Sequence, residues 1–258
     1  MDGFIECVKE ELSDKQIEHG AFRESEKYQQ EIKYFNGIVN DFIDVVRACF
    51  FTSTRDINLF NNSLLFNSSD AFLESAISCG MLVNEGAINP VYRELRYMLE
   101  VALKYTIVDQ VCYQLNYEER IDYFNKKIPK SSIDCIDDLQ LIGLEKSSIK
   151  DFINSSRDVY KKLCVYVHPS KTQINDWIKR EKKCAYLGFE SENEIKRISK
   201  STYNVLEIII TCYLNCLGVS SLGDVFIYYL DEKKKWKFHK SKYIKQMSQY
   251  YDYKFERK

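Results

Sequence analysis

The stretch SSRDVYKKLCVYVHPS, residues 155–170, combines a helical pattern with a clear stop. Tyr160 and Leu163 are spaced as on one face of a helix. Pro169 disfavours the α conformation of the residue before it, so we expect the helix to end at about His168. The partial negative charge of the last carbonyls would favour a protonated imidazole there. His168 could then meet a phosphate or transfer a proton; the plainer alternative is that it only caps the helix.

The same helical periodicity extends over most of the chain. Nine glycines and three prolines are few for 258 residues, and this scarcity of helix breakers favours long helices. The box Ser191-x-x-Glu194 predicts the start of the last long helix, and only Trp236-Lys237-Phe238 alternates as a strand would. The predicted helices cover residues 4–18, 25–51, 70–85, 90–113, 117–127, 136–142, 148–168 and 191–217.

We therefore predict an all-α protein, a single helical bundle with a basic and aromatic C-terminal extension. Residues 1–68 are expected to form N-terminal helices that pack on the bundle, residues 69–230 its core, and residues 231–258 the extension. We find no internal repeat, low-complexity block or linker that would divide the chain further.

Composition excludes several classes of protein. The net charge is −1, so no global field draws the chain to nucleic acid or to a membrane. The nine cysteines are scattered without metal-ligand spacing, which predicts reduced thiols, no zinc site and a cytoplasmic location. The N-terminus is acidic where a signal peptide is basic. The most apolar stretch, residues 205–217, is too short and too polar to cross a bilayer.

A stripe of charge runs along the apolar helix predicted for residues 90–113. At about 100° per residue, four charged residues fall in one sector, and Arg96 and Glu100 form an i,i+4 pair. The stripe is either a solvated edge with ordinary ion pairs or a polar lining of an internal cleft; Leu103 and Ile107, which border the sector, support the cleft. The residues of the stripe are Arg93, Arg96, Glu100 and Lys104.

Two motifs taken together resemble a known superfamily. The segment Arg96-Tyr97-Met98-Leu99-Glu100 and the later Tyr160-x-x-Leu163-x-x-x-Val167-His168-Pro169-Ser170 are similar to poorly characterised bacterial helical proteins related to the HEPN superfamily. The resemblance covers residues 70–217. It implies a compact, often dimeric helical bundle and, in many members, a metal-independent ribonuclease of toxin–antitoxin, abortive-infection or CRISPR systems.

One departure from the pattern concerns the arginine. Active HEPN ribonucleases carry Arg and His separated by four to six residues, whereas here that window before His168 holds Lys161, Lys162 and Leu163. A lysine keeps the charge and loses the bidentate fork. If the site is active, we expect Arg96 to come from the other helix, or Arg157 from a partner subunit.

The resemblance implies the following roles. His168 is the general acid or base, Arg96 binds the phosphate and Glu100 orients Arg96. Further RNA contacts are predicted on the two helices, where Tyr160 could stack a base or pack in the core, and in the tail, which could bind RNA or pack on the bundle. These predicted contacts are Arg93, Lys104, Arg157, Tyr160, Lys161, Lys235, Trp236 and Lys237.

The sequence thus predicts an RNA-binding or RNA-cleaving protein of bacterial defence, without cofactor or metal. Expected partners are RNA and either a second copy of the chain or a protein from the same operon, but no membrane. The alternative is a non-catalytic helical module that dimerises or holds a partner within a defence complex. A metal-dependent enzyme built on Asp134, Asp137 and Asp138 is a weaker alternative, because no second acidic cluster matches them.

Overall fold

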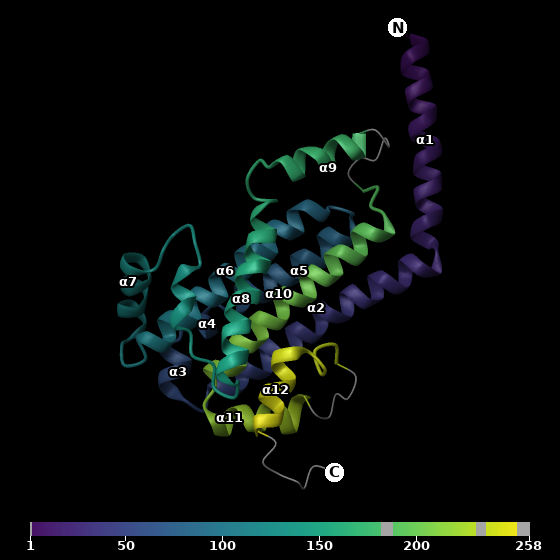
Figure 1. Cartoon of the computed structure of the whole chain (residues 1–258). Coiled ribbons are helices and arrows are strands. Elements are labelled where there is room, and N and C mark those ends of the chain that lie inside the picture. The colour runs from purple at the N-terminus through teal and green to yellow at the C-terminus, as the bar shows by residue number, and fades with distance from the viewer. Residues whose placement is uncertain (1, 182–187, 231–235, 252–258) are drawn as a thin grey trace.

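The computed structural model describes residues 2–181, 188–230 and 236–251. Within these ranges the chain is helical and contains no strand, which confirms the predicted all-α class (Figure 1). None of the described helices is both long enough and apolar enough to cross a membrane.

Four helices form the centre of the bundle. They are α2 (Glu26–Ser53), α5 (Ser69–Asn84), α6 (Ile88–Val111) and α10 (Glu192–Cys216). α10 packs against both α6 and α2, and α5 packs against the same two helices. The segment of α10 from Val205 to Asn215 is buried at every position, as expected of a helix that is apolar nearly all round. α2, which belongs to the N-terminal segment 1–68, thus lies in the core.

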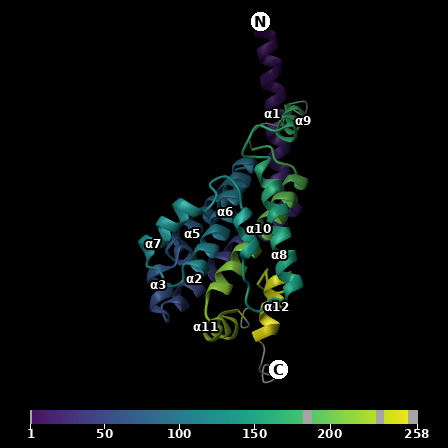
Figure 2. The same cartoon turned by 60° about the vertical axis from the view of Figure 1, so that its left-hand side comes forward.

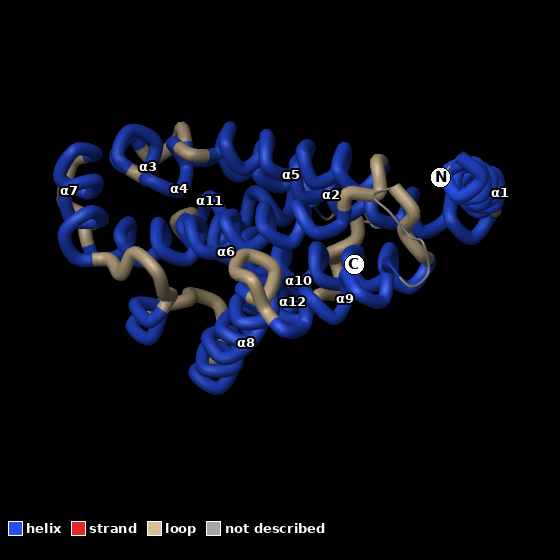
Figure 3. Tube along the Cα trace, turned by 90° about the horizontal axis from the view of Figure 1, so that it is seen from above, coloured by secondary structure: helices blue, strands red, loops and turns tan. Residues whose placement is uncertain are grey.

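A second group of helices surrounds this centre. α8 (Lys146–Cys164) packs on α6 on the side away from α5, as the view from above shows (Figure 3). α7 (Tyr117–Lys127) and the 3-10 helix η1 (Asp134–Asp138) lie beside α6 as well. The remaining elements are α1 (Asp2–Glu24), α3 (Ile57–Asn62), α4 (Leu64–Asn67), α9 (Lys171–Glu181), α11 (Val219–Asp224), the π-helix η2 (Val225–Leu230) and α12 (Lys242–Tyr251).

Local signals mark the helix ends. Ser191 and Glu194 form the predicted capping box of α10, in which each side chain binds the other residue's backbone N–H. Gly86 ends the turn after α5 with φ of 70°, a left-handed conformation that favours glycine. A Cβ at this position would also collide with the carboxylate of Glu190, so the turn needs glycine for two reasons.

α8 is shorter than predicted at its C-terminal end. It stops at Cys164, and turns replace the helix from Val165 onward. Two side chains bind carbonyls just past this end: Ser170 Oγ donates to the Val165 oxygen at 2.9 Å, and Arg93 Nε donates to the Tyr166 oxygen at 3.0 Å. The predicted helix 136–142 is also replaced, by η1.

The described part of the C-terminal extension, residues 236–251, packs on the bundle. Residues 236–238 form the start of a turn, so the strand-like alternation there was misleading. Trp236 and Phe238 are buried, and α12, which the sequence did not predict, contributes further apolar side chains to the core. Glu207 of α10 accepts a hydrogen bond from the Tyr243 backbone N–H at 3.0 Å and so fixes the start of α12. These buried residues of α12 are Tyr243, Ile244 and Met247.

Candidate functional site

The antiparallel contact between α6 and α8 brings the two motifs of the sequence together. Arg96 Nη2 donates to the Tyr160 hydroxyl at 2.8 Å, while Arg93, one turn earlier on α6, binds the carbonyl of Tyr166. Lower numbers on α6 therefore lie beside higher numbers on α8. The two helices are neighbours in both views of the bundle (Figures 1 and 2).

Glu100 lies at the centre of this contact, between two cations of its own helix. Its Oε2 lies 3.0 Å from Arg96 Nη2, and its Oε1 lies 2.5 Å from Lys104 Nζ. The Tyr160 hydroxyl donates to Oε2 at 3.2 Å. One carboxylate thus faces two cations, which leaves an excess positive charge where α6 meets α8. The polar stripe is buried only in its second half, at Glu100 and Lys104, whereas Arg96 is half-buried and Arg93 is exposed.

Burial makes Tyr160 and Lys104 parts of the interior rather than contacts for RNA. Arg96 lies over the Tyr160 ring, 5.1 Å from its centroid, which is cation–π geometry. Burial and the neighbouring Glu100 raise the pKa of Tyr160 to about 12, so its hydroxyl stays neutral at physiological pH. Lys104 is 3% exposed and also donates to the Lys130 carbonyl at 3.2 Å. Of the two alternatives for Tyr160, burial favours core packing over base stacking, and it argues against the RNA contact predicted for Lys104.

His168 is exposed and lies just past the end of α8. Its backbone N–H donates to the Cys164 carbonyl at 3.4 Å, so it stays within a turn of the helix end. Two residues earlier, Tyr166 stacks on Tyr92 with ring centroids 4.1 Å apart. Arg93, itself exposed, binds the carbonyl of the same Tyr166.

The sequence analysis missed Arg197, an exposed residue of α10 beside this pair of tyrosines. Burial raises the pKa of Tyr92 to about 12 and also raises that of Tyr166, and Arg197 opposes both rises. Arg197 of α10 thus acts on the stacked tyrosines Tyr92 and Tyr166. Arg93 also binds the backbone of Tyr166, while Arg96 lies over Tyr160. The position of Arg197 in the first turns of the predicted helix, three residues after Glu194, did not indicate which helix it would face. We call this surface, formed by Arg93, Arg96, His168 and Arg197, the arginine face.

The other predicted contacts on α8 do not join this network. Arg157 pairs with Asp137 of η1, with Nη2 and Oδ2 2.6 Å apart. Lys161 is exposed on the last turn of α8. No group of His, Cys, Asp and Glu within the described residues could hold a metal ion, so Asp134, Asp137 and Asp138 do not form such a site.

In the tail, Trp236 is only 6% exposed, and its ring packs near Phe238, 6.0 Å between centroids. It is closed to a nucleic acid base, which corrects the predicted stacking there. Lys237 lies over the Tyr34 ring at 5.1 Å, and Lys235 lies outside the described residues.

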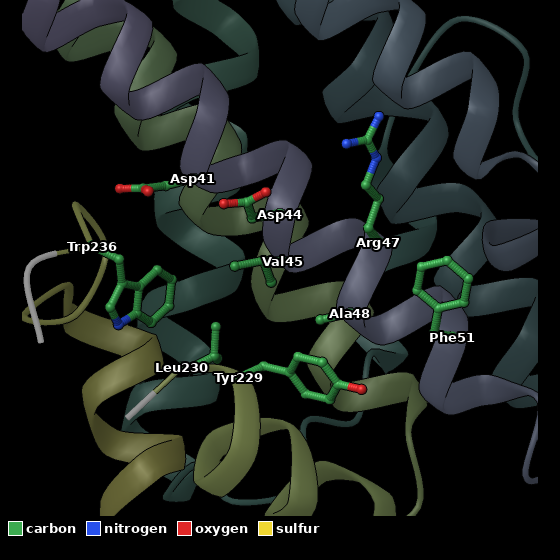
Figure 4. Close-up of a pocket in the computed structure, with 9 residues that line it drawn as sticks. All are labelled: Asp41, Asp44, Val45, Arg47, Ala48, Phe51, Tyr229, Leu230 and Trp236. Atoms are coloured by element: carbon green, nitrogen blue, oxygen red, sulfur yellow. The ribbon is translucent and has the colours of Figure 1, made fainter. Parts of the chain in front are cut away.

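A separate pocket lies between α2 and the chain that follows α11. Trp236 and Leu230 stand on one side of it, and Asp41 and Asp44 line the opposite wall on α2 (Figure 4). Its lining is mainly apolar, and it shares no residue with the arginine face. The complete lining is Asp41, Asp44, Val45, Arg47, Ala48, Phe51, Tyr229, Leu230 and Trp236.

Comparison with known proteins identified no relative: no family model, no curated protein and no solved structure matches this chain.

Proposed function

We propose that this protein binds RNA on the arginine face and that His168 is the proton-transfer group of a metal-independent RNA cleavage. The setting that we propose, bacterial anti-phage defence or a toxin–antitoxin system in the cytoplasm, rests on the resemblance to HEPN proteins alone. The observation that carries the RNA-binding proposal is the group of accessible arginines beside the α6–α8 contact, Arg93, Arg96 and Arg197, although Asp176 of α9 lies close enough to Arg197 to raise its pKa.

Charge and exposure support this choice of surface. Glu100 is the one carboxylate that faces Arg96 and Lys104, so it balances only one of them. Arg93 and Arg197 add two exposed guanidinium groups, and guanidinium matches the geometry of phosphate oxygens. Such a surface attracts a polyanion although the protein as a whole carries a net charge of only −1.

The reaction would be a transesterification within the RNA chain. A base takes the proton of a ribose 2′-OH, whose oxygen attacks the adjacent phosphorus and forms a 2′,3′-cyclic phosphate. The bond to the 5′-oxygen breaks, and that oxygen receives a proton. His168 is free to act as the base or the acid because it is exposed. Arg96, oriented by Glu100, would stabilise the charge on the phosphoryl oxygens.

The test compares two exposed histidines. Purified protein is incubated with labelled single-stranded RNA in EDTA. We expect cleavage by the wild type, its loss in His168→Ala, and unchanged cleavage in His239→Ala, which alters a histidine of the tail. RNA with a single 2′-deoxyribose at the cut position should resist. Cleavage that survives His168→Ala would contradict the proposed role of His168.

RNA binding is tested separately, by fluorescence anisotropy over a range of salt concentrations. The double variant Arg93→Gln, Arg197→Gln should bind more weakly and lower the slope of log affinity against log salt by about two, because two phosphate contacts are removed. Lys126→Gln, an exposed cation of α7, serves as the control. An unchanged slope in the double variant would exclude the arginine face as the RNA site.

The alternative function, a non-catalytic interaction module, is favoured by a different observation. α9 presents apolar side chains to solvent, and the next section argues what covers them. The two functions are compatible, since the apolar side chains of α9 are exposed whereas its Asp176 faces the bundle near Arg197.

A further inference from the structure

α9 is an amphipathic helix whose polar side faces the bundle. Gln173 is buried, and Asp176 and Arg180 are half-buried, so positions three and four apart point inward. Arg180 binds Glu194 at the start of α10, with Nη2 and Oε1 2.5 Å apart. The side that would normally enter a core therefore faces out.

The outward side of α9 is apolar and flanked by lysines. Ile174, Trp177 and Ile178 are 51%, 58% and 43% exposed, and they share one face at i, i+3 and i+4. Lys171 and Lys179 are exposed as well. A tryptophan between two isoleucines on an exposed helix face is typical of a docking surface rather than of scattered surface residues.

α1 is a second element without a full set of neighbours. It is a 23-residue helix that projects from the bundle, and its N-terminal end lies far from the other helices (Figures 1 and 2). Ile17 on this helix is 70% exposed. An isolated helix is only marginally stable in water, so a projecting helix gains most of its stability from packing on something.

The base of α1 is fixed by a buried carboxylate. Arg23 Nη2 lies 2.8 Å from Glu190 Oε1, and the Tyr28 hydroxyl donates to the same oxygen at 2.8 Å. His19 Nε2 lies 3.1 Å from the Glu190 backbone oxygen. These contacts at the base set the direction in which α1 leaves the bundle, and among the described elements α1 packs mainly on α2.

The charges of α1 and of the outward side of α9 are complementary. α1 contains seven acidic and three basic residues. Its exposed residues include Glu10, Asp14 and Glu18. The charged side chains described on the outward side of α9 are the two lysines. Both helices lie at the same end of the molecule, opposite α11 and α12 (Figure 1).

We propose that the apolar side of α9 docks on α1 of a second copy of this chain, and that the reciprocal contact forms a two-fold symmetric dimer. A two-fold interface uses the same surface on both subunits, so each copy contributes one α1 and one α9. Ile17 and Trp177 are buried in the contact, and Lys171 and Lys179 meet the acidic residues of α1. An anionic membrane is disfavoured as the occupant because the acidic α1 stands beside α9 and would be repelled.

The first test measures the oligomeric state of the protein by sedimentation. We expect the full-length protein to sediment as a dimer at tens of micromolar, and Trp177→Asp to raise the dimer dissociation constant at least tenfold. The matched control is Met81→Asp, which places the same charge at a 66% exposed apolar residue of α5 and should leave the dimer intact. A monomeric wild type, or equal effects of the two variants, would overturn the proposal.

The second test asks whether the two helices meet directly. Asp14→Lys with Glu18→Lys should weaken the dimer, and so should Lys171→Glu with Lys179→Glu. All four changes in one chain should restore it, because the charges are exchanged between the partner surfaces. Failure of this rescue with folded variants would overturn the pairing. Binding to phosphatidylserine vesicles that Trp177→Asp abolishes, with no change in mass, would assign α9 to a lipid surface instead.

Discussion

Two carboxylates on α6, Glu100 and Asp109, are both buried against cations, yet their surroundings differ. Asp109 meets one cation, Arg120, with Oδ1 3.0 Å from Nη1. It also accepts hydrogen bonds from the Ser63 hydroxyl and from two backbone N–H groups at the start of α4. Glu100 instead meets two cations and one tyrosine hydroxyl.

The difference separates a closed ion pair from an open one. Arg120 is 1% exposed, and its remaining donors are satisfied by the carbonyls of Leu115 and Tyr113. The Asp109 pair is therefore balanced in charge and almost fully buried, and it joins α6 to α4 and α7. Around Glu100 the cations outnumber the carboxylate, and Arg96 keeps 19% of its side chain exposed. The Asp109–Arg120 pair and the cluster around Glu100 therefore differ more in charge balance than in burial.

The largest expected effect comes from breaking the closed pair. Asp109→Ala leaves Arg120 buried without a counter-charge and removes the acceptor for the α4 N–H groups, so we expect a loss of about 3–5 kcal/mol in the free energy of unfolding. Urea denaturation followed by circular dichroism measures it. Asp122→Ala breaks an exposed ion pair with Lys126 on α7 and should cost less than about 1 kcal/mol. Similar losses in the two variants would refute the structural role of Asp109.

A smaller effect is expected at the open site. Glu100→Gln keeps the shape of the side chain but leaves Arg96 and Lys104 without their counter-charge, and we expect a loss of about 2 kcal/mol in the same urea experiment. The cost is lower than at Asp109 because Arg96 is partly solvated. A Glu100→Gln loss larger than that of Asp109→Ala would reverse the comparison between the two sites.

The smallest expected effect is a change in the free energy of unfolding that appears only at alkaline pH. The pKa of Tyr160 is raised to about 12 in the folded protein by burial and by Glu100, against about 10 in the unfolded chain. The folded state therefore holds this proton more tightly, and the resulting stability is complete below pH 10 and is lost as the pH rises toward 12. The stability difference between wild type and Tyr160→Phe should narrow over this range.

Denaturation curves at several pH values measure this narrowing. Tyr113→Phe, which alters an exposed tyrosine near the closed pair, is the control for loss of a hydroxyl. If the free energies of unfolding of wild type and Tyr160→Phe differ by the same amount from pH 8 to pH 12, the Glu100 site does not raise the pKa of Tyr160.

Part of the candidate site could be predicted from residue spacing. The helical period placed Arg96 and Glu100 on one sector of α6, and Leu103 and Ile107, which border it, are buried as expected. The identity of the third partner could not be predicted, because Tyr160 lies 60 positions from Glu100 and helical spacing says nothing about which helices pack. For the same reason Arg197 was missed.

In the tail, the sequence pattern fitted two different uses, and the sequence could not decide between them. Its alternating cations and aromatics fit RNA binding as well as packing, since both uses need rings and flanking charge. Trp236 and Phe238 turned out to be buried, a choice that depends on the surfaces of α2 and α10. Sequence composition contains no information about that fit.

The sequence by itself determined that the described chain is all-helical and, to within a few residues, where the four central helices begin and end; α1 continues to Glu24, six residues past its predicted end. Periodicity, capping boxes and the positions of Gly86 and Pro169 act over only a few residues, so they can be read locally. Only the tertiary structure decided that Lys104 is buried, that His168 is exposed and that α9 turns its apolar side outward. Burial and charge balance are set by neighbours distant in sequence, which no local pattern specifies.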